Sequence, residues 1–209
     1  MAAEVRSPKV GRPWYLVLAL LICSGLGAFG ATSGWETIEV YRGATVDFTH
    51  GVGREEDRVK VQAAGDRVLD AMDGERARMF PLAAAELVLG MGMFVFAAAA
   101  MMGRGGARRI VVQLVVAQTA LAIATFVLTP KTRWALLDLK VAQVEASQLE
   151  HGERPEVIAQ QAPILRAFSH GISMGQLIVQ AGVAALIVLA LTRQRALAFY
   201  DAQSEPTEG

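Results

Sequence analysis

The residue with the clearest potential for chemistry is Glu86, which lies inside an otherwise apolar stretch of the chain. A carboxylate in such a stretch is costly unless it is protonated, paired or near water. Glu86 lies about two helical turns from one end of its apolar stretch. His170 and Ser173 lie at the start of another apolar stretch, at a similar predicted depth, and Arg133 lies just beyond the end of a third. We therefore predict a cluster of Glu86, His170, Ser173 and Arg133 that serves first as a structural lock between helices. Ligand or proton binding by the same four residues is the functional hypothesis.

A metal site is a second possibility at the same place. His170 and Met174 are one helical turn apart, and an imidazole with a thioether suits Cu(I). Methionine is also ordinary packing in membrane helices, so we expect no cofactor, with copper as the alternative. Haem b is not expected, because His50, His151 and His170 are all predicted at the surface or outside the membrane, away from its midplane.

Sequence signatures of common enzymes are absent. The chain contains no G-x-x-x-x-G-K-[ST], no G-x-S-x-G and no H-E-x-x-H pattern. We therefore predict a non-enzymatic protein with a scaffold, accessory or small-ligand-binding role. Transport or handling of a small solute or of copper is one alternative. A membrane enzyme acting on lipid or quinone is another, and it would need an ordered acid/base pair.

The elements that must position these residues are membrane helices. Hydrophobic residues make up 53% of the chain and charged residues only 19%. A span needs about 20 mostly apolar residues, and four stretches qualify, at about 14–32, 80–102, 110–129 and 171–192. We predict an all-α integral membrane protein, with residues 1–209 forming a single membrane domain built on a four-transmembrane-helix bundle.

Charge and cysteine content exclude other classes. Twenty basic residues balance 20 acidic ones, so the chain has no overall charge with which to bind nucleic acid, and its single cysteine cannot form an internal disulfide. Basic residues cluster in the N-terminal tail, in the turn at 104–109 and after residue 192. The positive-inside rule then places both termini in the cytoplasm and segments 33–79 and 130–170 outside the inner membrane. A cleaved signal peptide over the first stretch is the alternative.

Both external segments contain helical patterns. Apolar residues recur at helical spacing in 55–73, and again in 134–148 after Pro130. The ring of Pro130 removes a backbone donor and bends the chain, which is more tolerable at the membrane boundary than at its centre. We therefore predict helical extensions on the outer side, with the second one continuing the third span.

Small and polar residues inside the spans indicate close helix packing. Gly30 and Gly34 have the spacing that lets two backbones approach, within one chain or across a homodimer or larger membrane assembly. Gln118, Gln176 and Gln180 are expected to form hydrogen bonds between helices. The basic turn at 104–109 suits an anionic lipid headgroup better than a phosphate loop.

The second half of the chain carries a family resemblance. The run Phe126-Val-Leu-Thr-Pro-Lys-Thr-Arg133, followed by Phe168-Ser-His-Gly-Ile-Ser173, resembles the bacterial transmembrane-protein-205-like family, which is distantly similar to copper-resistance D proteins. The resemblance covers about residues 110–191. It implies a bacterial four-span protein in which Pro130, Arg133, His170, Gly171 and Ser173 shape the outer end of the bundle, and it names no substrate.

Overall fold

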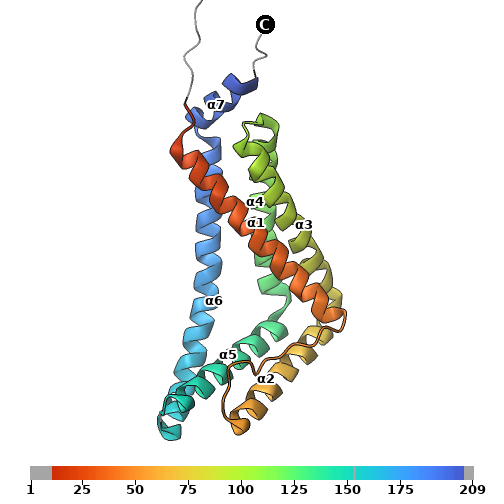
Figure 1. Cartoon of the computed structure of the whole chain (residues 1–209), viewed down its shortest axis with the longest axis vertical. Helices are drawn as coiled ribbons and strands as arrows, with labels where there is room; N and C mark the ends of the chain where they lie inside the picture. Colours follow the sequence, from red (N-terminus) through yellow and green to blue (C-terminus); the bar gives the residue numbers. More distant parts are fainter. Residues whose placement is uncertain (1–10, 153, 205–209) are drawn as a thin grey trace, which may run out of the picture. The chain divides into compact units, whose positions relative to one another are not determined.

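The computed structural model describes residues 11–152 and 154–204, and all regular structure within these ranges is α-helical (Figure 1). The helices are α1 (Trp14–Tyr41), α2 (Glu55–Gly74), α3 (Arg76–Met101), α4 (Gly105–Leu128), α5 (Pro130–Glu150), α6 (Pro155–Thr192) and α7 (Gln194–Ser204).

Four of these helices are long and apolar enough to cross a membrane. They are α1, α3, α4 and the Pro163–Thr192 part of α6, with mean hydropathies from 1.9 to 2.2 over their most apolar windows. Their order along the chain matches the four predicted stretches. The prediction of an all-α, four-span, multi-pass membrane protein with additional helices is thus confirmed.

The helices do not end where the apolar stretches end. α1 continues beyond residue 32 to Tyr41, and α6 begins at Pro155, so His170 lies inside a 38-residue helix rather than at the start of one. α5 is a separate helix after the break at Thr129 rather than a continuation of α4. Hydropathy indicates which part of a helix can be surrounded by lipid. The backbone hydrogen bonds of a helix also form in water, so a helix can continue beyond its apolar stretch.

The chain divides into two compact units, each drawing on all four long helices. Unit 1 comprises the described residues of Met1–Ser33, Glu86–Ala120 and Ala181–Gly209. Unit 2 comprises the described residues of Gly34–Ala85 and Leu121–Gln180. Each unit has its own hydrophobic core, and the two are described separately below.

The core of unit 1 includes α7, a helix that sequence reasoning did not identify. Ala196, Phe199 and Tyr200 are buried on one face of α7, at the i, i+3 and i+4 spacing of an amphipathic helix. The Tyr200 hydroxyl donates to the carbonyl of Ala100 at 2.9 Å, which ties α7 to the end of α3. Burial raises the pKa of the Tyr200 phenol, although Arg12 and Arg108 oppose that effect, so the phenol stays a neutral donor.

α1 and α3 approach each other closely in unit 1, and this approach depends on two glycines. A Cβ atom on Gly90 would lie 2.5 Å from the backbone nitrogen of Ala31, and one on Gly27 would lie 2.7 Å from the carbonyl oxygen of Gly90. Both obstacles are backbone atoms, which cannot rotate away. Two backbones therefore touch directly, as small residues permit in membrane helices.

The core of unit 2 lies between α2 and α5, which run side by side in Figure 1. Val61 and Val68 of the predicted α2 stripe are buried against Leu139 and Ala146 of α5. The segment between α1 and α2 covers this pair, because the ring of Phe48 packs directly on Gly65, where any Cβ atom would collide with it. The predicted outer helices are thus a packed pair.

We expect Gly90→Ala to destabilise unit 1. Its methyl group meets backbone on α1, and overpacking of this kind costs about 1–3 kcal/mol. The measurement is the thermal unfolding midpoint of purified protein in a mild detergent. Gly25→Ala is the matched control, since a Cβ there meets nothing within 4 Å. Equal midpoints for the two variants would contradict the proposed backbone contact.

Candidate functional site

The break between α4 and α5 organises the polar residues of unit 2. Pro130 has no N–H group, so it cannot donate the helical hydrogen bond that the carbonyl of Phe126 would otherwise accept. The guanidinium of Arg133 fills this position, with Nη1 donating to the Phe126 carbonyl at 2.7 Å. The same guanidinium lies over the Phe126 ring, 4.0 Å from its centroid. Arg133 therefore closes the end of α4.

The start of α5 has the opposite need, because its first N–H groups lack helical partners. Thr129 stands at the N-cap position without a side-chain capping bond. The carboxylate of Glu75 supplies the cap from another part of the chain, accepting from the N–H groups of Lys131 at 3.2 Å and Thr132 at 3.1 Å. The Thr132 hydroxyl donates to the same carboxylate at 2.8 Å.

Electrostatics of Glu75 follow from this geometry. The side chain is buried, which by itself would raise its pKa. The hydrogen bonds from Thr132 and Lys131, with a smaller contribution from Arg78, outweigh burial and hold the pKa of the carboxyl below its usual value. Glu75 therefore remains ionised, the form that best caps a helix N-terminus.

Further contacts join the same junction. Glu75 itself separates α2 from α3. Arg78, on the first turn of α3, donates to the carbonyl of Leu128 at the end of α4, at 3.4 Å. The hydroxyl of Tyr41 donates to the carbonyl of Met72 near the end of α2, at 2.9 Å. The ends of five helices, α1 to α5, are thus held by side-chain bonds to backbone.

His170 lies against Trp134, the residue that follows Arg133 in α5. Its ring stacks on the indole of Trp134, with 4.9 Å between centroids and 12° between planes. Trp134 is 50% exposed, so one part of this stack is open. The Nδ1 atom of His170 and the Nε atom of Arg133 are buried and have no hydrogen-bond partner among the described residues. Such atoms are uncommon in folded proteins and mark positions where a further polar group would be stabilised.

The other predicted residues of α6 have different surroundings. The Ser173 hydroxyl donates to the carbonyl of Ser169 in its own helix at 3.1 Å. Met174 is 44% exposed, Gln176 is exposed and Gln180 is half-buried. A Cβ atom on Gly171 would meet nothing within 4 Å.

Glu86 belongs to unit 1, whereas His170, Ser173 and Arg133 belong to unit 2, so the four-residue cluster stays a prediction. Within unit 1, Glu86 lies near two other predicted residues. A Cβ atom placed on Gly30 would be 2.9 Å from Nε2 of Gln118 and 3.8 Å from Cγ of Glu86. The missing side chain of Gly30 therefore leaves room for a carboxyl and a carboxamide beside α1.

Hydrogen bonding in this second cluster is incomplete. Gln118 is buried, and its Oε1 has no hydrogen-bond partner among the described residues. Within the described part of unit 1, no hydrogen bond or ion pair to the Glu86 carboxyl is found. Gly34, the other glycine of the predicted pair, is buried in unit 2.

Metal-binding residues do not gather in the described ranges: no group of three or more His, Cys, Asp or Glu side chains there has metal-site geometry. His170 and Met174, the predicted copper ligands, lie on one helix in unit 2.

Comparisons with protein-family models, with curated proteins and with solved structures found no match to this chain. The resemblance to the transmembrane-protein-205-like family therefore stays a prediction.

Two residues of the junction were not identified from sequence. Glu75 is 57 positions from Thr132, and no local pattern connects a carboxylate to a helix start so far away. Trp134 was recognised only as part of an apolar helical stripe. The Thr-Pro pair at 129–130 was the available signal, since a break in a helix requires partners for its free N–H and C=O groups.

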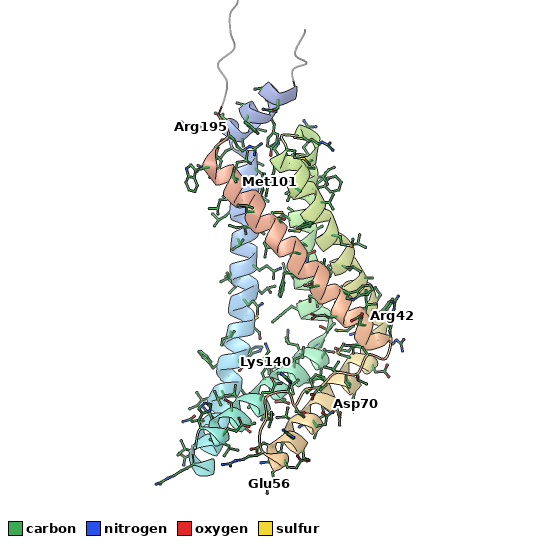
Figure 2. The ribbon with its side chains drawn as sticks, in the orientation of Figure 1. Arg42, Glu56, Asp70, Met101, Lys140 and Arg195 are labelled. Atoms are coloured by element: carbon green, nitrogen blue, oxygen red, sulfur yellow. The ribbon has the colours of Figure 1, made fainter. Side chains whose placement is uncertain are left out.

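We expect Glu75→Gln to destabilise the protein by about 1–3 kcal/mol, because a neutral amide is a weaker acceptor than a carboxylate and its NH2 group faces N–H donors. The measurement is chemical or thermal unfolding in detergent at neutral pH. Glu56→Gln is the control, since Glu56 is exposed at the start of α2 (Figure 2) and its change should cost at most about 0.5 kcal/mol.

The same variant should also respond differently to acid. The folded-state pKa of Glu75 lies below the reference value of 4.5, so its stabilisation is complete above that value and is lost as the pH falls through the folded pKa. Wild-type protein should therefore lose more stability than Glu75→Gln on acidification below about pH 4.5. Parallel pH profiles for the two proteins would show that the Glu75 cap does not contribute.

Proposed function

We propose that this multi-pass membrane protein is a non-enzymatic accessory or scaffold protein of the bacterial inner membrane, with both termini in the cytoplasm. In this role, the four spans carry the α2–α5 helical pair on the outer side of the membrane. The observation that supports it is that Glu75 and Arg133, two charged residues at the α4–α5 junction, serve as caps for helix ends.

Side chains that cap helices are poor candidates for catalysis. A general acid or base needs a proton that it can exchange with substrate, whereas both Glu75 oxygens accept bonds from Lys131 or Thr132. Arg133 is likewise committed to the Phe126 carbonyl. Glu86, the residue on which a lipid or quinone enzyme would depend, has no paired acid or base within the described part of unit 1. The polar groups support a fixed arrangement of helices better than a reaction.

The accessory role requires the α2–α5 pair to lie outside the membrane and α7 inside, which cysteine labelling can test. Glu56→Cys should react with a membrane-impermeant maleimide in spheroplasts, and Arg195→Cys only after lysis, because the two exposed residues belong to these two elements (Figure 2). Wild-type protein is the control, since its one cysteine, Cys23, is buried. The reverse labelling pattern would overturn the proposed orientation and role.

A second candidate function is the binding of a small ligand, or of copper, by unit 2. The specific observation in its favour is the buried, unpartnered Nδ1 of His170 beside the partly open indole of Trp134. Met174, one turn further along α6, is 44% exposed and would supply a thioether.

Cu(I) is the probe for this second candidate. Purified full-length protein should retain one copper ion per chain after equilibration with Cu(I) and removal of free metal, and His170→Ala should lose it. His151→Ala is the matched control, because His151 contacts the Ser147 carbonyl in its own helix rather than Trp134. Equal copper content in wild type and His170→Ala would remove copper binding at His170 from consideration.

A further inference from the structure

The end of unit 1 that contains α7 is strongly basic. The described residues of this unit include six arginines but only two acidic residues, Glu86 and Asp201. The arginines are Arg12, Arg104, Arg108, Arg109, Arg193 and Arg195. Figure 2 labels Arg195, which belongs to α7, at this end. Glu86 lies within the α3 span, so Asp201 is the one described acidic group of unit 1 outside the spans.

A cavity opens at this basic end, between the start of α4 and α7. Its volume is about 250 Å³, below the range of about 300–1,000 Å³ that is typical of sites for drug-sized ligands. It therefore suits a small group rather than a large organic molecule. The lining residues are Gly105, Gly106, Arg108, Arg109, Tyr200 and Asp201.

Arg108 is held in place as one wall of the cavity. Its Nη1 donates to the carbonyl of Leu191 at 2.8 Å, near the end of α6. Its guanidinium carbon lies 5.8 Å from the centroid of the Tyr200 ring. Its Nε atom is buried and has no hydrogen-bond partner among the described residues. The cavity wall thus includes a cation that is held in place by protein contacts.

Arg109 and the glycines supply the remaining donors. Arg109 is exposed, and no hydrogen bond or ion pair of its side chain is found among the described residues. Gly105 and Gly106 are the first two residues of α4, whose N–H groups have no partner within the helix. A Cβ atom on Gly106 would meet nothing within 4 Å, so its backbone is accessible. Guanidinium groups and free helix N–H groups together are the donor set that binds phosphate oxygens.

We propose that this cavity binds a phosphate group, carried either by an anionic lipid headgroup or by free phosphate. Two guanidinium groups against the single carboxylate of Asp201 leave the lining residues with a net positive charge. In the orientation proposed above, the cavity faces the cytoplasmic leaflet, where anionic headgroups attract basic residues next to spans. The lipid source requires that orientation, whereas binding of free phosphate does not.

The test compares Arg109, on the first turns of α4, with Arg104, which directly precedes that helix. Full-length protein in a neutral detergent is titrated with phosphatidylglycerol, and bound lipid is counted by native mass spectrometry; a parallel titration uses inorganic phosphate. Arg109→Gln should weaken binding about tenfold, the scale of one charge-assisted hydrogen bond. Arg104→Gln removes the same charge from an exposed residue that does not line the cavity, and should weaken binding by only about twofold.

A third variant is expected to change phosphate binding in the opposite direction. Asp201→Asn removes the negative charge from the cavity wall and should strengthen phosphate binding, an effect that general loss of folding would not produce. Thermal unfolding of each variant checks its fold. Selective loss in Arg109→Gln with phosphatidylglycerol supports a headgroup as the source, and the same loss with inorganic phosphate alone supports free phosphate. Equal losses in Arg109→Gln and Arg104→Gln, or no binding of either probe, would overturn the proposal.

Discussion

A proline without an N–H group is the constraint on which unit 2 depends. Pro130 ends α4, and the break leaves carbonyl groups on one side and N–H groups on the other, each needing a partner. Arg133 bonds the Phe126 carbonyl, and Glu75 bonds the first N–H groups of α5. Because Glu75 also separates α2 from α3, one carboxylate connects two helix junctions and holds α2 beside α5.

This arrangement changes how the charged residues should be interpreted. Arg133, singled out as a ligand-binding residue, is engaged with the backbone and with the Phe126 ring. Of the four buried polar atoms without a hydrogen-bond partner in the described part of unit 2, two lie at this place, the Arg133 Nε atom and the His170 Nδ1 atom. The structural and ligand-binding interpretations are thus compatible, because the cap positions Arg133 and Trp134 while leaving donors next to the stacked histidine.

Unit 1 solves the packing of apolar helices in a different way. Backbone contact at Gly27 and Gly90 joins α1 to α3. The apolar face of α7 packs against the same hydrophobic core. Both devices bury surface without requiring charged groups inside the unit. Its arginines accordingly gather at the end formed by α7 and the start of α4, where a cavity separates the two elements.

Some properties were determined by the sequence alone: the membrane class, the four spans and their order, and the presence of additional helices, because hydropathy over some 20 residues is a local property. The Gly30-x-x-x-Gly34 pattern predicted close helix packing, and the backbone of Gly30 lies at the contact with Gly90 of α3 together with that of Gly27, whereas Gly34 belongs to unit 2. The partners of Glu75, the stack of Trp134 on His170 and the docking of α7 were decided only by the tertiary structure. These contacts join residues that are far apart in the chain, and which donor meets which acceptor depends on the angles at which helices pack.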